Sequence, residues 1–140
     1  MSKVAIVFWS ATGNTETMAN CIAEGAGANG TIVACAEMTP AKLAEFDVVA
    51  FGCPAMGAEQ LEESEFEPMF AALEGSLNGK KIALFGSYGW GDGQWMRDWA
   101  QRAQDDGAQL FSEEGLICDE TPDDDVHAAC RKLGADLAAW

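Results

Sequence analysis

The fold class is decided by the stretch Lys3-Val4-Ala5-Ile6-Val7-Phe8-Trp9-Ser10-Ala11-Thr12-Gly13-Asn14-Thr15. Its first half is almost uniformly apolar, as in a strand that is covered on both faces of a sheet. Its second half is small and polar, and beyond it one apolar face recurs at helical spacing through Met18, Cys21, Ile22 and Gly25. A buried strand that passes through a short polar loop into a helix is typical of an α/β protein.

The same alternation continues to the end of the chain. Apolar runs predict strands at residues 31–36, 47–53 and 81–87, and a weaker one at 108–118 that a polar segment, residues 112–114, interrupts. Helices are predicted from the apolar faces formed by Phe66, Met69, Phe70, Leu73 and Leu77, by Trp95, Trp99 and Ala103, and by Val126, Cys130, Leu133 and Leu137. The last helix is expected to have Thr121 as its cap and Pro122 at its first position. This order indicates one doubly wound α/β domain over residues 1–140, with a parallel sheet covered by helices on both faces.

The composition restricts the class of protein. The chain of 140 residues has a formal net charge of -15, which argues against a nucleic acid partner and favours protein partners with basic surfaces. No apolar run is long enough to cross a membrane, and the run before Ser10 is too short for a signal peptide, so the expected location is the cytoplasm. The five cysteines form no CxxC pair, and most are expected to be small core side chains in a reducing compartment.

In a doubly wound sheet, ligands bind beyond the carboxyl ends of the strands, so the loops there are the candidate sites. The first loop, residues 10–15, can direct amides and hydroxyls at an anion from the start of a helix. No lysine follows Gly13, which excludes the loop that holds a nucleoside triphosphate and suggests a monophosphate. An ordinary capped helix is the alternative. The segment Gly25-Ala26-Gly27-Ala28-Asn29-Gly30 matches a dinucleotide motif in letters only, because it ends a helix instead of opening one.

The other two loops suit a planar ring. In the second, residues 53–59, Met56 offers a soft apolar surface, Gly57 lets its peptide take more than one orientation, and Glu59 offers a carboxylate to a ring N–H. A turn with solvated carboxylates is the alternative. In the third, residues 87–93, Trp90 stands between two glycines and can stack on a ligand. The alternative there is a mobile turn with an exposed indole.

Two catalytic classes are excluded. The only histidine, His127, falls in the last predicted helix, which removes Ser-His-Asp and Cys-His nucleophile systems. A response-regulator receiver of the same fold class needs an acidic pocket after the first strand and an aspartate after the third. This chain has Ser10-Ala11 and Cys53-Pro54 in those places.

Four segments together resemble the flavodoxins, in particular the short-chain type of clostridial anaerobes. They are Trp9-Ser10-Ala11-Thr12-Gly13-Asn14-Thr15-Glu16, Gly52-Cys53-Pro54-Ala55-Met56-Gly57, Leu61-Glu62-Glu63-Ser64 and Phe85-Gly86-Ser87-Tyr88-Gly89-Trp90-Gly91. The resemblance implies a five-stranded sheet in the order 2-1-3-4-5, with FMN bound non-covalently at the switch point between strands one and three.

The resemblance also implies a role for each site residue. The FMN phosphate is held by Ser10, Thr12, Gly13, Asn14, Thr15 and the amide of Ala11. Met56 and Trp90 cover the inner and outer faces of the flavin, amides of Gly89, Trp90 and Gly91 face its pyrimidine edge, and Glu59 accepts from N3–H. The remaining expected site residues are Pro54, Ala55, Gly57, Ala58, Ser87 and Tyr88. Ala11 replaces a usual glycine and Ala58 a frequent polar residue, which leaves their effect on FMN affinity open.

The implied function is that of a low-potential one-electron carrier, not a catalyst. The flavin is expected to cycle mainly between neutral semiquinone and hydroquinone, with Met56-Gly57 as a redox-linked hinge. Carboxylates of Glu59, Glu62, Glu63 and Asp92 are expected to lower the second potential. With Glu65 and Glu67, the glutamates are expected to steer basic partners such as ferredoxin- or flavodoxin-dependent oxidoreductases, hydrogenase or reductases. The chain is expected to be a monomer with no membrane contact.

Three other functions remain open from the sequence. A small FMN-dependent reductase of quinones would need a substrate pocket and a nicotinamide site, for which no residues stand out. An FMN-binding activator of a single enzyme could share the same loops. A binding module without flavin is the third possibility.

Overall fold

The opening apolar run forms β1 (Val4–Phe8), a central strand of the sheet in the computed structural model, which describes residues 1–140. The other strands are β2 (Gly30–Ile32), β3 (Val48–Gly52), β4 (Lys81–Tyr88), β5 (Gln109–Leu110) and β6 (Leu116–Asp119), and all pair in parallel. The order is β2-β1-β3-β4-β5, and β6 also pairs with β4. The predicted doubly wound sheet and its order are therefore confirmed.

The predicted fifth strand, residues 108–118, is two short strands along one neighbour. β5 pairs with the start of β4 and β6 with its end, and residues 111–115 leave the sheet between them. The predicted interruption by polar residues is thus confirmed. The second strand was predicted too long, because the chain turns into a short 3-10 helix at Cys35–Glu37.

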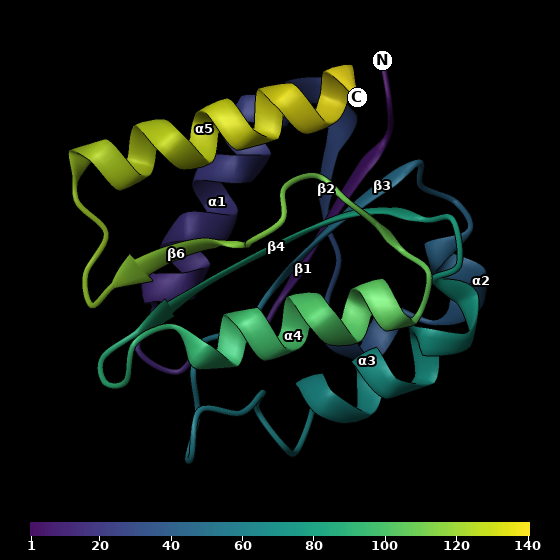
Figure 1. Cartoon of the computed structure of the whole chain (residues 1–140). Helices are drawn as coiled ribbons and strands as arrows, with labels where there is room; N and C mark the ends of the chain where they lie inside the picture. The colour runs from purple at the N-terminus through teal and green to yellow at the C-terminus, as the bar shows by residue number, and fades with distance from the viewer.

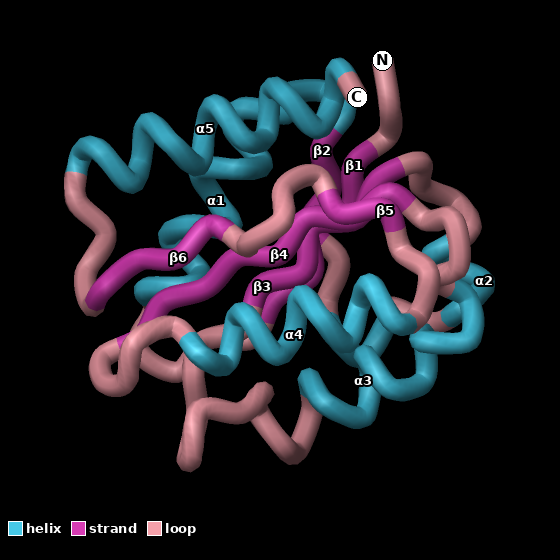
Figure 2. The backbone as a smooth tube through the Cα atoms, in the orientation of Figure 1, coloured by secondary structure: helices cyan, strands magenta, loops and turns pink.

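Helices cover both faces of the sheet (Figures 1 and 2). On one face lie α1 (Asn14–Ala26) and α5 (Asp124–Ala139), and on the other α3 (Phe66–Leu73) and α4 (Gln94–Asp105). The short helix α2 (Pro40–Leu43) and the 3-10 helices at Gly27–Asn29 and Glu74–Ser76 complete the elements. Each face has its own core, as expected for a buried parallel sheet. Trp95 and Trp99, each 2% exposed, belong to the core under α3 and α4, as predicted.

Helices α1 and α5 approach each other through two glycines. A Cβ at Gly134 would overlap the carbonyl oxygen of Ile22, and a Cβ at Gly25 would overlap that of Arg131. Gly25 begins the segment that mimics a dinucleotide motif. The structure shows that segment at the end of α1, where Gly27 has a φ of 62°. Its glycines thus serve helix packing and helix termination.

The start of α5 differs from the prediction. Asp123, not Thr121, caps this helix, and its carboxylate accepts a hydrogen bond from the Val126 N–H at 3.0 Å. Pro122 lies before the helix because the chain is still turning at Glu120, whose φ is 60°.

The cysteines pack as small apolar side chains. Four are buried, Cys35 is half-buried, and all five are free thiols. Burial raises the pKa of Cys53 and of Cys130 to about 12, so these thiols stay neutral. None of the helices has the length and apolar character that crossing a bilayer requires.

Candidate functional site

A cavity of about 310 Å³ lies where the carboxyl ends of β1, β3 and β4 meet. Three loops and the residue after β6 contribute its lining: Ser10, Ala11, Thr12, Asn14, Thr15, Pro54, Ala55, Met56, Ser87, Tyr88, Gly89, Trp90 and Glu120. All of these except Glu120 are site residues expected from the sequence. The structure therefore brings the three predicted loops together around one space.

The first loop presents free backbone donors to this cavity. The Ser10 hydroxyl accepts hydrogen bonds from the N–H groups of Gly13 at 3.1 Å and Glu16 at 3.3 Å, which holds the loop in a tight turn. Gly13 makes that turn possible with a φ of 95°. The N–H groups of Ala11, Thr12, Asn14 and Thr15 donate to no group of the chain. Unpaired amides at the start of α1 form a cradle for an anion.

The floor of the cavity joins the first loop to β4. The hydroxyls of Thr15 and Ser87 lie 2.9 Å apart, and the Ser87 N–H donates to Thr15 Oγ1 at 3.3 Å. Both residues are buried. Because their side chains bond to each other, they fix the position of the loop relative to the sheet.

The second and third loops are tied together across the cavity mouth. Met56 and Gln60 exchange two backbone hydrogen bonds, of 2.8 and 2.7 Å, and close a turn that contains Gly57 at a φ of 52°. The indole N–H of Trp90 donates to the Gly57 carbonyl at 3.2 Å. The Trp90 side chain is 51% exposed, so it lies over the mouth and not in the core.

Glu59 has a carboxylate oxygen with no partner. Its Oε1 is buried and makes no hydrogen bond, and its backbone has a φ of 54°, which is rare outside glycine. The carboxylate packs against Gly91, where a Cβ would overlap it. A buried and unpaired acceptor costs free energy unless a ligand N–H reaches it. The residues at this edge therefore fit the imide N–H of a flavin.

Five expected site residues do not line the cavity itself: Gly13, Gly57, Ala58, Glu59 and Gly91. Gly13 shapes the first loop, while Gly57 and Glu59 contact the third loop through Trp90 and Gly91. Glu120 was missed. Its N–H donates to the Tyr88 carbonyl at 2.7 Å, which places it beside the third loop. A strand that pairs with the end of β4 must also end at this edge of the sheet, but the weak apolar run at 108–118 did not reveal such a strand.

The acidic residues after the second loop are less free than predicted. Glu62 is only 6% exposed and caps α3, where its carboxylate accepts from the N–H groups of Ser64, Glu65 and Phe66 and from the Ser64 hydroxyl. Burial raises the pKa of Glu62, but these hydrogen bonds outweigh burial and lower it to about 2. The expectation of Glu62 as a solvated steering charge is therefore wrong.

Three other charges of this region also have partners. Glu65 accepts from the indole N–H of Trp9 at 2.8 Å, and Glu67 pairs with Arg102 at 2.7 Å. Asp92 pairs with Arg97 at 3.0 Å. Glu63 is exposed and forms no ion pair. The ion pairs reduce the contribution of Glu67 and Asp92 to the field around the cavity.

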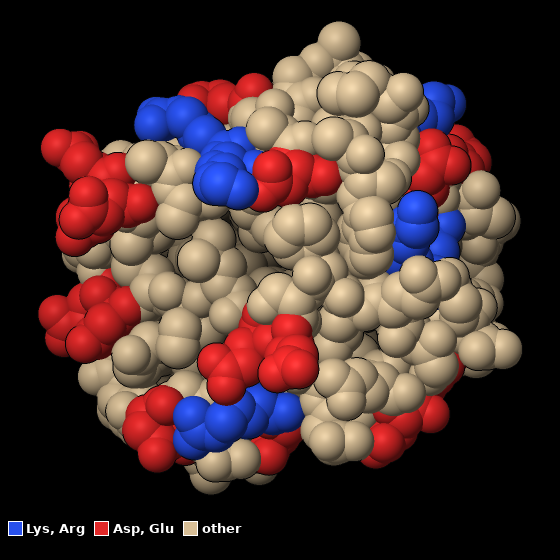
Figure 3. All heavy atoms as spheres, turned by 45° about the horizontal axis from the view of Figure 1, so that its top comes forward, with Lys and Arg blue, Asp and Glu red and all other residues tan.

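Acidic groups nevertheless dominate the surface. Figure 3 shows red carboxylates gathered along the edge where α5 begins in Figure 1, with no blue group among them. Asp123, Asp124 and Asp125 lie at that edge and are exposed.

Fold and site together define a doubly wound protein with a cavity at the carboxyl edge of its sheet, in which free amide groups suit an anion and Met56 and Trp90 suit a planar ring. The flavodoxin family model matches residues 6–133. The chain is 47% identical to a flavodoxin of Megasphaera elsdenii over 138 residues, 96% of this chain and 98% of the relative. It is 44% identical to a flavodoxin of Clostridium beijerinckii over 136 residues, 95% of this chain and 97% of the relative. The chain belongs to the flavodoxin family.

Solved structures agree with this assignment. The solution structure of two-electron reduced Megasphaera elsdenii flavodoxin superimposes with a TM-score of 0.87 at 46% identity, covering 98% of this chain and 99% of that one. The crystal structure of oxidised flavodoxin 1 from Bacillus cereus gives a TM-score of 0.83 at 26% identity, and the match covers 99% of this chain and 98% of that one. The chain is thus an FMN-binding electron carrier and not a catalyst.

Proposed function

We propose that residues 1–140 act as one FMN-binding domain and that the protein is a low-potential donor of single electrons. When bound, FMN supplies the redox chemistry by taking up electrons on a ring that gains negative charge. The chain sets how favourable each electron is through the groups that it places around that ring. The unpaired carboxylate oxygen of Glu59 carries this proposal, because it is both a hydrogen-bond acceptor and a negative charge.

The first loop supports the phosphate end of the proposal. The four free N–H groups of residues 11, 12, 14 and 15 suit the oxygens of a monophosphate, and the Ser10 hydroxyl keeps its own proton to donate. No Lys or Arg lines the cavity. We therefore assign the phosphate to neutral donors and to the positive end of α1.

The ring end is assigned to the other two loops. Met56 and Trp90 both line the cavity, and we assign the flat ring to the space between them, where it would contact a thioether and an indole. The Glu59 carboxylate would accept from the ring imide, and the amides of the third loop would face the same edge. Pro54, Ala55 and Tyr88 complete the wall, and Ala58 lies in the second loop without lining the cavity.

The charge balance supports a low potential. The residues that line the cavity include a carboxylate, Glu120, and no cation, and the Glu59 carboxylate lies beside Gly91. Negative charge that builds up there is repelled at short range and is poorly solvated under Trp90. The second electron should therefore be harder to add than the first.

The proposed partners are redox proteins with basic surfaces, met by a monomer in the cytoplasm. The net charge of -15 supports this, because long-range attraction speeds the encounter with a basic surface. Glu120 lines the cavity and is exposed, and Asp119, Glu120's neighbour in the chain, is exposed as well. We assign steering to these two carboxylates and to the exposed Glu63, which follows the second loop in the sequence.

A reductive titration of the FMN-loaded protein at neutral pH tests the proposal. Two separated one-electron steps are expected, and one direct two-electron step would contradict it. Riboflavin, which lacks the phosphate, serves as the matched ligand for the first loop. It is expected to bind at least about ten-fold more weakly than FMN, and equal affinities would contradict the phosphate assignment.

A further inference from the structure

A second cavity, of about 280 Å³, lies away from the FMN site between β4, the β5–β6 connection and α5. Its apolar lining residues include Ala83, Leu110, Phe111, Leu116, Ala129 and Leu133. None of these residues lines the first cavity. The two spaces are therefore separate sites.

The break in the fifth strand creates this cavity. Ile82 of β4 pairs with Leu110 and Phe85 pairs with Leu116, so that Ala83 and Leu84, which pair with β3 on one side, have no strand beside them on the other. Residues 111–115 turn outward and are held by their own hydrogen bonds, in which the Ser112 hydroxyl donates to the Glu114 carbonyl at 2.6 Å. The hollow is thus a fixed consequence of the backbone path.

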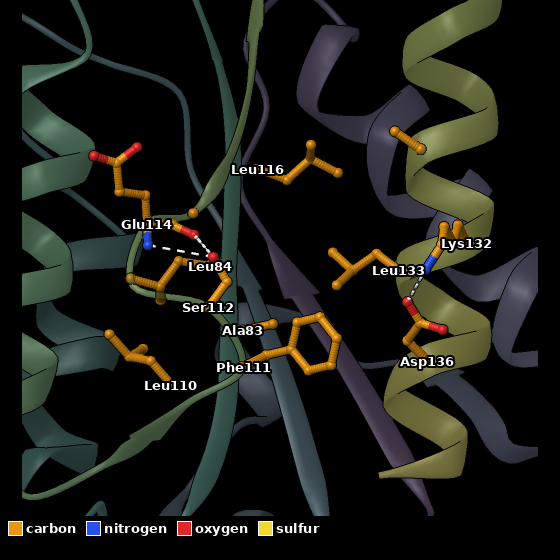
Figure 4. Close-up of a pocket in the computed structure, with 12 residues that line it drawn as sticks. Ala83, Leu84, Leu110, Phe111, Ser112, Glu114, Leu116, Lys132, Leu133 and Asp136 are labelled. Carbon is orange, nitrogen blue, oxygen red and sulfur yellow. Dashed lines mark hydrogen bonds and ion pairs between the residues drawn. The ribbon is translucent and has the colours of Figure 1, made fainter.

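The walls of the cavity are apolar and converge on one space. Figure 4 shows Leu116 and Phe111 on the sheet side and Leu133 of α5 facing them across the hollow. Ala83 and Ala129 contribute only methyl groups, which leaves room that longer side chains would fill. An apolar surface without neighbouring atoms forgoes dispersion contacts, so an apolar guest of matching size would gain them.

The charges at the rim decide the kind of guest. Lys132 is the one cation, and Asp136 pairs with it at 2.7 Å, while Glu114 adds a second carboxylate. In Figure 4 the Glu114 side chain turns away from α5 and from the hollow. No free cation is left to hold an anion, and the apolar walls offer nothing to an ammonium group.

We propose that this second cavity is a binding site for an uncharged, planar aromatic molecule of one or two rings. An apolar cavity of about 150 Å³ is enough for benzene, and this one is larger. A rigid ring system also loses less conformational freedom on binding than a flexible chain of equal volume. The site is independent of FMN and of the electron-transfer role.

Titration of the FMN-loaded, ¹⁵N-labelled protein with 2-naphthol tests the proposal. Saturable amide shifts are expected around residues 110–116 and 129–133, with FMN retained. Size-matched 2-naphthoate, an anion, is expected to bind at least about ten-fold more weakly. Shifts that do not saturate, that centre on the first cavity, or that accompany loss of FMN would overturn the site, and equal binding of 2-naphthoate would overturn its preference for neutral guests.

Two neighbouring alanines of α5 provide matched variants. Ala129→Leu fills the cavity and is expected to weaken 2-naphthol binding at least about ten-fold, whereas Ala128→Leu adds the same atoms on the exposed side and should change it less than about two-fold. Equal effects of the two variants would overturn the proposal. If Ala129→Leu does not fold, Ala129→Ser decides, because a hydroxyl in the apolar wall should weaken binding several-fold without a change in volume.

Discussion

The indole N–H of Trp90 donates to the carbonyl oxygen of Gly57 at 3.2 Å and so joins two loops of the proposed FMN site that are far apart in sequence. Gly57 is the second residue of the Met56-Gly57 peptide, which was expected to turn with the redox state. The hydrogen bond holds the Gly57 carbonyl in one orientation and opposes that turn. In the proposed site, Trp90 would both cover the ring and restrain the hinge.

Replacing Trp90 with Phe keeps an aromatic ring but removes the N–H donor. A hydrogen bond of this kind contributes about 0.5–1.5 kcal/mol, which corresponds to roughly 20–65 mV for one electron. We expect Trp90→Phe to raise the first one-electron midpoint potential by that amount, because loss of the indole N–H would leave the Met56-Gly57 hinge free to turn when the flavin is reduced. Potentiometric titration measures this, and an unchanged or lower first potential would refute the restraint.

Gly57 itself has a φ of 52° and open space around the position of a Cβ. In Gly57→Thr the β-branched side chain resists this backbone conformation. We expect oxidised FMN still to bind, but a smaller fraction of the flavin to be reduced by one electron at the midpoint of a reductive titration. Gly75→Ala is the control, since Gly75 also has open space, needs no positive φ and does not line the cavity. An unchanged one-electron fraction in Gly57→Thr would argue against the hinge.

The lowered pKa of the Glu62 carboxylate predicts that the free energy of unfolding falls in acid. Its pKa is lowered to about 2 from an ordinary value of 4.5, so its stabilising effect is complete above pH 4.5 and is lost as the pH falls toward 2. In Glu62→Gln, an amide with one acceptor oxygen replaces the carboxylate that accepts from the N–H groups of residues 64–66. The substitution should lower the free energy of unfolding by about 1–3 kcal/mol at pH 7.

Urea unfolding of the two proteins between pH 7 and pH 2 measures the effect. The difference between wild type and Glu62→Gln should shrink steadily below pH 4.5. Glu63→Gln, at the exposed neighbour, should behave like the wild type throughout. A gap between wild type and Glu62→Gln that stays constant down to pH 2 would show that the carboxylate charge is not what holds the start of α3.

The close contact between α1 and α5 predicts that one methyl group added at Gly134 lowers the free energy of unfolding. In Gly134→Ala the new Cβ would meet the Ile22 carbonyl, and the two helices would have to separate. We expect the free energy of unfolding to fall by about 1–3 kcal/mol, even though alanine has a better helix propensity than glycine. Gly75→Ala, where nothing lies near the Cβ, should be neutral. Thermal unfolding compares the two, and equal melting temperatures would contradict the close contact.

The parts of the fold that could be predicted are those in which one physical requirement acts alone. A strand that is buried on both faces must be apolar, so the apolar runs at residues 3–9 and 47–53 predicted β1 and β3. The three site loops were predicted because they follow such strands. Glu120 was missed because the weak apolar run at 108–118 did not show that a second strand, β6, ends beside Tyr88.

Other features depend on contacts that no local pattern contains. Glu62 looks like one of several solvated glutamates, and only the turn of the chain at residues 64–66 brings three N–H groups to its carboxylate. The cap of α5 falls at Asp123 because Glu120 takes a positive φ, which the sequence does not signal. The cavity beside Ala83 likewise follows from strand pairing and not from the residues that line it.

The midpoint potential of the second one-electron step, measured on the FMN-loaded protein at pH 7, tests the central claim most directly. The unpaired Glu59 carboxylate and a cavity lined by no cation predict a value below that of free FMN, and Glu59→Gln should move it back toward free FMN. A second potential equal to or above that of free FMN would contradict the account of a low-potential donor.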